Sequence, residues 1–319
     1  MNLYLGIEIG GTKLQIGLGP ADGKLLSLWR DNVNVARGGE GIREQILQAI
    51  PELIQQAKVE RSQLHGVGIG FGGPIDDRTQ SVIKSHQIEG WNDFPLAAWL
   101  SEALQLPCIL GNDADVAGLA EAIHGAGQGL SPIFYMTIGS GIGGGFIVDG
   151  EIYRAVGRGA AEIGHLRILD NRPAGDQQYH ALELLSSGWG IGNYARRVLK
   201  LQPEAPSDLR ELGLPIEQIM ATHVAQAAKE EDPLARSILE DCLQPIAEAL
   251  ASVIVLLCPR RIVIGGGVSF MGEDLFFQPL RRLVAERCFL PFVGLTEIVP
   301  ASLGEEVVVH GALELAKRR

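Results

Sequence analysis

Two stretches of the chain share one pattern of apolar runs joined by glycine-rich turns. Residues 3–18, LYLGIEIGGTKLQIGL, consist of an apolar strand, a Gly-Gly-Thr turn and a second apolar strand. Residues 133–153 repeat this plan, with an apolar run, the turn TIGSG, a second apolar run and the turn pair Asp149-Gly150. Short apolar runs bounded by turn residues predict strands joined in hairpins. Two similar hairpins about half a chain apart predict that the protein consists of duplicated halves.

Each predicted hairpin is followed by alternating helices and strands. Apolar residues at three- and four-residue spacing within 42–57 predict an amphipathic helix. The other predicted elements are strands over 66–70, 107–111, 261–264 and 297–300, and helices over 114–123, 246–257, 275–288 and from residue 305. Hairpins followed by β/α units, twice over, predict an α/β protein of two similar lobes. Ligands of open α/β sheets bind beyond the carboxyl ends of strands, so we expect Asn112-Asp113 and Gly265–Gly267 to face one crevice.

Composition narrows the class of protein without changing this picture. The 319 residues are 46% hydrophobic and 20% charged, which is typical of a globular protein long enough for two domains. A net charge of −11 disfavours nucleic acid and anionic membranes as partners, because both attract clustered Lys and Arg. The N-terminus lacks the basic lead of a secretory signal, and the apolar run 249–258 is too short to span a membrane. The four cysteines lie far apart in apolar segments, as buried thiols do, and we expect a soluble cytoplasmic protein.

The second turn also contains the spacing of a dinucleotide-binding fingerprint, Gly139-x-Gly141-x-x-Gly144. That fingerprint must open a helix, because the helix N-terminus receives the pyrophosphate of the cofactor. Here a strand over 146–148 and a turn follow instead. The pattern therefore disfavours an NAD-dependent enzyme.

Glycine-rich hairpins suit phosphate for another reason. Without a Cβ, backbone N–H groups can converge on anionic oxygens, and a Thr or Ser hydroxyl adds a donor. A tight hairpin needs glycine in any case, so one such turn alone would be weak support. Two equivalent hairpins and a glycine triplet together favour a nucleoside triphosphate clamped between the lobes. The candidate nucleotide-binding residues are Gly10, Gly11, Thr12, Lys13, Thr137, Gly139, Ser140, Gly141, Gly265, Gly266 and Gly267.

Asp113, in the segment LGNDAD, is the candidate general base. A carboxylate at a strand end could take a proton from a hydroxyl whose oxygen attacks the γ-phosphate, and such a base contributes about 10²–10⁴-fold to the rate. Asp113 could instead cap the helix predicted over 114–123. The neighbouring Asn112 both donates and accepts hydrogen bonds, which suits a polyol.

A second polar set consists of Glu162, His165 and Glu183. A single histidine is more often a hydrogen-bonded residue of the core than a ligand. Two carboxylates and an imidazole after a phosphate hairpin are better explained by sugar hydroxyls, which supply both donors and acceptors to buried polar groups.

Taken together, these motifs resemble the ROK family of sugar kinases, within the actin-like ATPase superfamily. The resemblance extends over nearly the whole chain through GIEIGGTK, GIGFGGPID, NDA, TIGSGIGGG, GAAEIGH, VIGGGV and SLGEEVVVHGA. It implies two lobes of the actin-like, ribonuclease H-like type with a nucleotide and sugar cleft between them. It also implies a homodimer that uses ATP and Mg²⁺ to phosphorylate a hexose, as a glucokinase or a related sugar kinase does.

The resemblance also assigns roles to residues and segments. Asp113 is implied as the base, and both hairpins with Gly265–Gly267 as the nucleotide site. The residues implied to hold the sugar are Gly73, Asn112, Glu162, His165 and Glu183. The implied division is an N-terminal lobe over 1–113, a C-terminal lobe over 114–302 and a helix over 303–319 that returns to the first lobe.

The chain departs from the family pattern in its first lobe at two positions. Glu8 stands where the family usually has Asp, and we expect it to bind Mg²⁺, directly or through water, with a side chain one methylene longer. Gln87 stands where glucose-phosphorylating members commonly have Asn, which leaves the identity of the sugar open.

A third departure concerns zinc. ROK members often follow the EIGH histidine with a Cys-x-Cys-Gly-x-x-Gly-Cys-x-Glu segment, and that histidine joins three cysteines around zinc. Counted back from Glu183, the cysteine positions are Ala174, Asp176 and Ala181, and alanine has no ligand atom. Only a weaker site of Asp176, His180 and His165 would remain.

We therefore expect no structural zinc. The loop over 166–180 is expected to be held by packing and hydrogen bonds around Leu166, Ile168 and Tyr179.

Two alternative functions stay open beside the kinase. Some ROK members are sugar-responsive repressors with a helix-turn-helix before the first hairpin; here that hairpin begins within nine residues of Met1, so we expect no such domain. A sugar-binding sensor without catalysis is the other alternative, although the retained Asp113 favours catalysis. Polyphosphate also stays open as a phosphoryl donor.

Overall fold

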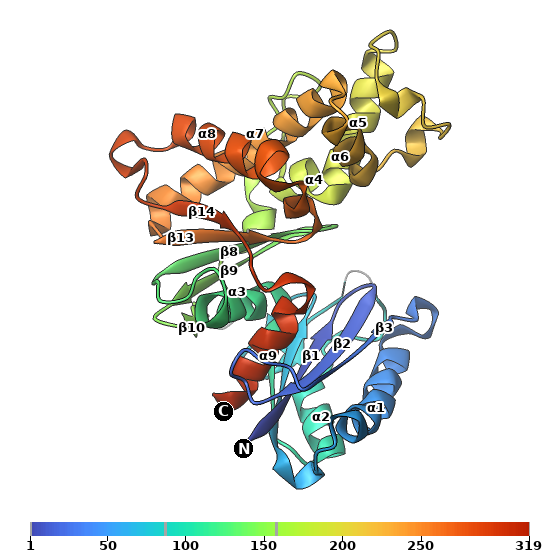
Figure 1. Cartoon of the computed structure of the whole chain (residues 1–319), viewed down its shortest axis with the longest axis vertical. Coiled ribbons are helices and arrows are strands. Elements are labelled where there is room, and N and C mark those ends of the chain that lie inside the picture. Colours follow the sequence, from blue (N-terminus) through green and yellow to red (C-terminus); the bar gives the residue numbers. More distant parts are fainter. Residues whose placement is uncertain (1, 86–87, 157–158, 319) are drawn as a thin grey trace. The chain divides into compact units, whose positions relative to one another are not determined.

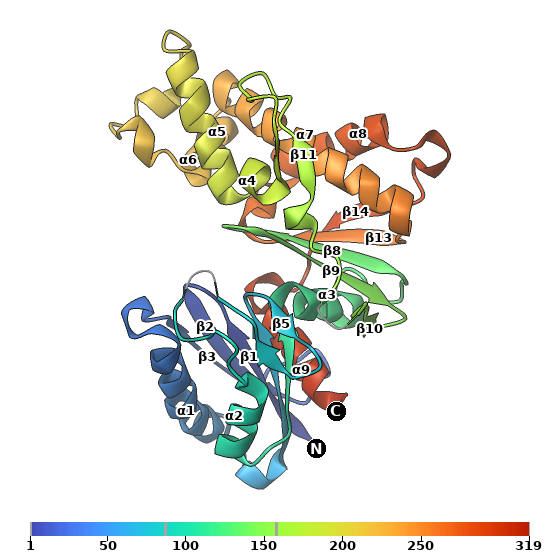
Figure 2. The same cartoon turned by 180° about the vertical axis from the view of Figure 1, so that it is seen from behind.

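The computed structural model describes residues 2–85, 88–156 and 159–318. By its internal contacts the chain divides into two compact units. Unit 1 comprises Met1–Tyr135, Gly145–Ala161 and Ala301–Arg319, and unit 2 comprises Met136–Gly144 and Glu162–Pro300. Figures 1 and 2 show the elements of both units from opposite sides. The predicted boundary between an N-terminal lobe ending at residue 113 and a C-terminal lobe beginning at residue 114 concerns function, and it stays a prediction.

Two five-stranded sheets have the same strand order, in agreement with the duplicated α/β plan. The first sheet has the order β3 (Ser27–Asn32), β2 (Lys13–Gly19), β1 (Leu3–Ile9), β4 (Leu64–Phe71) and β7 (Cys108–Asn112). The second has the order β10 (Glu151–Ile152), β9 (Ile142–Val148), β8 (Ile133–Ile138), β13 (Arg261–Gly265) and β14 (Glu297–Pro300). In each half the first three strands form a meander, and the fourth strand then pairs with the first.

In unit 1, helices cover both faces of the first sheet. The helices are α1 (Gly38–Ala57), α2 (Leu96–Leu104), α3 (Asp113–His124) and α9 (Val307–Lys317). Figures 1 and 2 show α1 and α2 on one face and α9 on the other. Glycines on the second face let α9 approach closely, since a Cβ on Gly6 would lie 2.5 Å from the Val309 carbonyl oxygen and one on Gly68 would overlap Ala312. The opposite face packs Leu5 and Ile7 into an apolar core with α1.

Unit 2 contains five α-helices, all within its segment Glu162–Pro300, every residue of which the structure describes. They are α4 (Leu182–Ser186), α5 (Gly188–Leu201), α6 (Ala221–Lys229), α7 (Pro233–Leu257) and α8 (Gln278–Arg287). The helix predicted over 246–257 is the second half of α7, which continues through Pro245. It begins earlier because Asp232 caps it, accepting hydrogen bonds from the backbone N–H groups of Leu234 and Ala235 at 2.8 and 3.0 Å.

Two short hairpins complete the strands, β5 (Ile75–Asp76) with β6 (Ser81–Val82) and β11 (Arg167–Leu169) with β12 (Tyr179–Ala181). Cys108 and Cys242 are buried as expected, whereas Cys258 and Cys288 are half-buried. Within the described ranges, the chain contains no helix of the length and apolarity that crossing a membrane requires.

Candidate functional site

The carboxyl ends of three parallel strands meet at one edge of the first sheet. Ile9 at the end of β1 pairs with Phe71 at the end of β4, and Phe71 pairs with Asn112 at the end of β7. The first hairpin turn, the Gly72-Gly73 loop and Asn112-Asp113 follow these ends directly. Within unit 1 the structure therefore brings together the phosphate hairpin, part of the sugar set and the candidate base.

Asn112, rather than Asp113, caps helix α3. The Asn112 Oδ1 accepts hydrogen bonds from the N–H groups of Ala114 and Asp115 at 2.9 and 3.3 Å, which satisfies the free end of the helix. The Asn112 Nδ2 donates to the Gly73 carbonyl oxygen at 3.2 Å. This amide thus joins the Gly72-Gly73 loop to the helix, and its oxygen is already used by the cap.

Asp113 is the first residue of α3 and is half-buried. Its Oδ1 accepts a hydrogen bond from the Ala114 N–H at 2.8 Å. Its Oδ2 lies 3.3 Å from where a Cβ on Gly72 would stand, so the absence of a side chain there leaves room beside the carboxylate. The positive end of the helix dipole favours the ionised form that a base requires.

The first hairpin joins this edge through its backbone. The Gly10 N–H donates to the Lys13 carbonyl oxygen at 3.0 Å, and the Gly72 N–H donates to the Ile9 carbonyl oxygen at 2.9 Å. Thr12 is exposed at the tip of the turn, and the Lys13 ammonium lies 3.7 Å from the Glu305 carboxylate. The turn thus presents one hydroxyl and one cation.

Glu8 lies on β1 just before this turn. Its Oε2 accepts a hydrogen bond of 2.6 Å from the Gln15 side-chain amide. Burial raises the pKa of Glu8, against the opposing effects of the Lys13 charge and the Gln15 hydrogen bond. Within the described residues, the Gln15 Oε1 is buried without a hydrogen-bond partner. A carboxylate oxygen beside an unsatisfied amide oxygen fits Mg²⁺, which takes few protein oxygens and keeps several waters.

The second hairpin is held by the start of α5 and by Glu183 of α4. The Gly188 N–H donates to the Gly139 carbonyl oxygen at 2.8 Å, and the Ile142 N–H donates to the Glu183 Oε2 at 2.9 Å. A Cβ on Gly141 would clash with that carboxylate oxygen, whereas one on Gly139 would meet nothing within 4 Å. Glu183 therefore supports the turn, in addition to the role in sugar binding that the sequence predicts.

A cavity of about 400 Å³ opens beside this hairpin within unit 2. Three predicted nucleotide-binding residues, Gly139, Ser140 and Gly267, line it. Gly266, at φ +84°, packs behind them, because a Cβ there would lie 2.6 Å from the Ile138 carbonyl oxygen. The glycine triplet and the second hairpin are thus adjacent, as the sequence predicts.

Most of the remaining cavity wall comes from residues that the motifs do not reveal. These are Gly188, Ala221, Thr222, Ala225, Gln226, Lys229, Val268, Phe270 and Met271. Helix α6 supplies the second to the sixth of them, and it begins about 80 residues beyond the hairpin. No local pattern marks an amphipathic helix as the wall of a cavity. Such a pocket, mostly apolar with a few polar groups, suits a nucleobase and ribose.

Glu162 immediately precedes a short 3₁₀ turn, Ile163–His165, and His165 is the last residue of that turn; both side chains are exposed. The Leu182 N–H donates to the Leu166 carbonyl oxygen at 2.9 Å, which brings this turn close to α4 and Glu183. The sugar set is therefore divided, with Glu162, His165 and Glu183 in unit 2 and the others in unit 1. Their meeting around one sugar stays a prediction, and Gln87 lies outside the described residues.

The segment that carries zinc in many family members does not fit a metal here. Both oxygens of Asp176 contact the His180 Nε2 at 2.9–3.0 Å, and this hydrogen bond lowers the pKa of Asp176. Over the described part of the chain, no three His, Cys, Asp or Glu side chains group as a metal site would require. The absence of zinc from the protein stays a prediction. Of the residues expected to hold the loop, Ile168 is buried, whereas Leu166 and Tyr179 are exposed.

Two sheets of equal topology, each opened by a glycine hairpin, define an α/β protein of the actin-like ATPase class. The chain belongs to the ROK family, whose model matches residues 4–319. It is 32% identical to the glucokinase of Thermotoga maritima over 99% of this chain and 97% of that protein. It is similar to the structure of a ROK glucokinase from Streptomyces griseus in complex with glucose and AMPPNP, with a TM-score of 0.80 and 29% identity over all of both chains.

A repressor is also among its relatives. The xylose repressor of Caldicellulosiruptor bescii is 23% identical over 98% of this chain and 77% of that protein. The family thus contains both sugar kinases and sugar-responsive regulators.

Proposed function

We propose that the protein is an ATP- and Mg²⁺-dependent hexose kinase of the glucokinase type. The observation that carries the proposal is the edge of the first sheet, where the Asp113 carboxylate, the open side of Gly72 and the first glycine hairpin follow three aligned strand ends. The nucleotide complex of the Streptomyces griseus glucokinase and the cavity beside Gly139 support ATP as the phosphoryl donor.

The two sets of polar residues would bind and orient the sugar. Gly73 and Asn112 would contact it from unit 1, and Glu162, His165 and Glu183 from unit 2. Asn112 keeps one N–H for this purpose, because its oxygen caps α3 and its other N–H has a partner in the Gly73 carbonyl. Binding would exclude water that could otherwise hydrolyse ATP.

Asp113 would act as the general base. The acceptor hydroxyl gives its proton to the Asp113 carboxylate while its oxygen forms a bond to the γ-phosphorus, and the bond from that phosphorus to the leaving oxygen of ADP breaks. The products are the sugar phosphate, ADP and the proton held by Asp113, which passes to solvent.

The phosphates would lie against backbone N–H groups. These belong to both hairpins, Gly10–Lys13 and Thr137–Gly141, and to Gly265–Gly267, with Lys13 as the cation. Glu8 would hold Mg²⁺ directly or through water, and the ion when bound neutralises charge on the phosphates.

An ADP-release assay with a panel of hexoses and N-acetylhexosamines tests the proposal. We expect ATP-dependent turnover with at least one hexose in the presence of Mg²⁺. The same panel with polyphosphate, with the sugar phosphate measured directly, tests the donor. Sugar binding in calorimetry without formation of a sugar phosphate from either donor would favour the second candidate, a non-catalytic member, which the repressor among the relatives supports.

Replacing the proposed base isolates the chemical step. Asp113→Asn should lower kcat at least ~10²-fold and keep most of the sugar affinity, because only proton acceptance is lost. Asp93→Asn, in an exposed turn of the same unit, is the matched control and should keep wild-type kcat. Near wild-type turnover of Asp113→Asn would assign Asp113 to a structural role. Sedimentation of the wild-type protein tests the homodimer that is part of the proposal.

A further inference from the structure

A buried arginine lies at the centre of the loop between β11 and β12. Arg172 and Asp170 are 5% and 3% exposed. The Arg172 Nε donates to the Asp170 Oδ1 at 2.6 Å, and its Nη2 donates to the Asp170 Oδ2 at 2.9 Å. A buried charge is tolerated only when it is paired and hydrogen-bonded, and this bidentate geometry supplies both. The pair therefore fixes the conformation of the loop from within.

The same guanidinium reaches three helices. Its Nη1 donates to the Leu185 carbonyl oxygen of α4 at 3.0 Å and contacts the Cys242 Sγ of α7 at 3.6 Å. Its carbon lies 4.0 Å from the centre of the Tyr194 ring of α5. Burial by itself lowers the pKa of Arg172, but the hydrogen bonds and charge of Asp170 hold it above its ordinary value. One permanent cation thus joins the loop to α4, α5 and α7.

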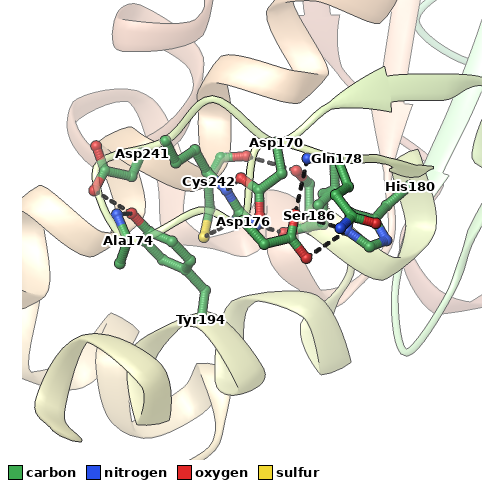
Figure 3. A network of polar contacts seen from close by, with 11 residues as sticks. Asp170, Ala174, Asp176, Gln178, His180, Ser186, Tyr194, Asp241 and Cys242 are labelled. Atoms are coloured by element: carbon green, nitrogen blue, oxygen red, sulfur yellow. Dashed lines mark hydrogen bonds and ion pairs between the residues drawn. The ribbon is translucent and has the colours of Figure 1, made fainter. Parts of the chain in front are cut away.

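A second layer of hydrogen bonds lies beyond the direct contacts of this cation. Figure 3 shows the part in which Tyr194 joins Asp241 and Ala174. The Tyr194 hydroxyl donates to the Asp241 Oδ2 at 2.8 Å and accepts from the Ala174 N–H at 3.2 Å. The Ser186 hydroxyl donates to the Cys242 carbonyl oxygen at 2.8 Å. Burial raises the pKa of the Cys242 thiol to about 12, so it is a neutral neighbour of the cation.

Helix α4 connects this network to the candidate site. Leu185 accepts the hydrogen bond from Arg172, and Glu183, two residues earlier, accepts the one from the Ile142 N–H of the second hairpin. The helix has only five residues, Leu182–Ser186, which is too short to be stable by itself. Its position depends on the packing of the buried Leu182 and Leu185 and on the groups hydrogen-bonded to either side.

We propose that Arg172 is a positioning residue that fixes α4, and through it the Glu183 carboxylate, in a loop where other family members use zinc. The role of Glu183 toward sugar rests on the proposed function. Ala174 and Ala181 offer no ligand atom and Asp176 is paired with His180, so the described residues of this segment do not fit a metal. The contacts of Arg172 with Asp170 and with three helices instead hold the segment.

Substitutions at Arg172 test the proposal. Arg172→Met keeps the length of the side chain and removes the charge and the donors, and Arg172→Lys keeps the charge without the fork. We expect the KM for sugar to rise ~10-fold or more in Arg172→Met, with the KM for ATP changed less than ~2-fold, and a smaller rise in Arg172→Lys. The matched control is Arg197→Met. Arg197 is an exposed residue of α5 that lines, together with Arg172, a cavity of about 170 Å³. This variant should leave the KM for sugar and the KM for ATP unchanged.

Hydrogen exchange separates positioning from general destabilisation. In the folded variants, peptides covering 139–142 and 182–186 should exchange faster than in the wild type, while peptides from β1 and β4 keep their protection. If Arg172→Met fails to fold, the same measurements are made on Arg172→Lys and on the double variant Asp170→Asn/Arg172→Met. The double variant leaves no unpaired buried charge. A lowered melting temperature with an unchanged KM for sugar, equal rises in both KM values, or unchanged exchange at 182–186 would overturn the proposal.

Two further experiments test the role of Arg172 independently of the proposed kinase activity and of zinc binding. If the wild type phosphorylates no sugar, the kinase proposal fails, and the exchange experiment together with sugar affinity by calorimetry still decides the role of Arg172. Elemental analysis of tag-free wild-type protein should find no zinc, and a zinc-selective chelator should leave the melting temperature unchanged. Near-stoichiometric zinc, or a melting temperature lowered by the chelator, would show that a metal holds the segment and would overturn the role of Arg172.

Discussion

The two glycine hairpins share a backbone plan but have different surroundings. The first turn, 10–12, is flanked by charged side chains: Glu8 precedes it and Lys13 follows it. The Glu305 carboxylate forms ion pairs there with Lys13 at 3.7 Å and with Arg30 at 3.3 Å. The second turn, 139–141, contains no Lys or Arg, and it is held by the Glu183 carboxylate and by a backbone hydrogen bond from Gly188 of α5. Charged side chains surround the first turn, whereas the second turn packs closely against Glu183 and the start of α5.

This difference shows how a duplicated element acquires two tasks. Backbone N–H groups in a glycine turn attract any anion. Under the proposed function, the neighbouring side chains decide which part of the nucleotide each turn would contact. Lys13 and Glu8 beside the first turn would favour the transferred phosphate and Mg²⁺, and the cavity beside the second turn would favour the rest of the nucleotide. The following predictions test that division, from the largest effect to the smallest.

A methyl group at Gly141 should damage the second hairpin most. Because a Cβ there clashes with the Glu183 Oε2, Gly141→Ala should displace the carboxylate from the Ile142 N–H. We expect kcat/KM for sugar to fall about 10–100-fold. The free energy of unfolding should fall by about 1–3 kcal/mol, because one hydrogen bond to a charged group is lost. Gly139→Ala is the matched control, because its Cβ meets nothing within 4 Å and the apo protein should keep its melting temperature. Equal activity of the two variants would contradict the close-fit role.

Removing the cation should weaken ATP binding through the first hairpin. Lys13→Met should raise the KM for ATP about tenfold, equivalent to about 1.4 kcal/mol, and change the KM for sugar little. Stability should hardly change, because the ion pair with Glu305 is partly exposed. Lys24→Met, in the exposed turn after β2, is the control for the loss of one positive charge. A KM for ATP that stays at the wild-type value would remove Lys13 from the phosphate site.

The half-buried Glu8 carboxylate beside the first hairpin should lower stability in the absence of ligands. The pKa of Glu8 is raised in the folded protein, so its contribution to stability is fully present below the unfolded pKa and is lost as pH rises through the folded pKa. Glu8→Gln removes this loss, and its melting temperature without Mg²⁺ should exceed that of the wild type by a small amount at pH 7–8 and match it near pH 4. Thermal unfolding across this pH range measures the difference.

Glu183→Gln serves as the comparison from the second hairpin. Its carboxylate accepts a backbone hydrogen bond, so this variant should be less stable than the wild type at pH 7. The same sign of change for Glu8→Gln and Glu183→Gln would contradict the contrast between the hairpins.

The strand that the sequence missed and the helix that it shortened lack a clear local signal, for different reasons. Strand β3, SLWRDN, is polar at its end because it lies at the sheet edge, so no apolar run marks it. The first half of α7 was obscured by Pro245, which usually breaks a helix, although Asp232-Pro233 is a good helix start. Similarly, Asp113 and Asn112 both look like caps, and only the hydrogen bonds show that Asn112 is the cap.

The sequence by itself determined the features that depend on neighbouring residues. Apolar runs and glycine turns established the hairpins, their repetition predicted the α/β halves, and the order of motifs indicated the family and the candidates around Asp113. These signals are local, because strands and turns are encoded within a few residues. Tertiary structure alone decided which distant residues meet: α6 as a wall of the cavity beside Gly139, Glu183 against Gly141, and Arg172 buried with Asp170. A charged Arg in a loop would ordinarily face solvent, and only packing against three helices, with a carboxylate to neutralise it, makes burial the more stable state.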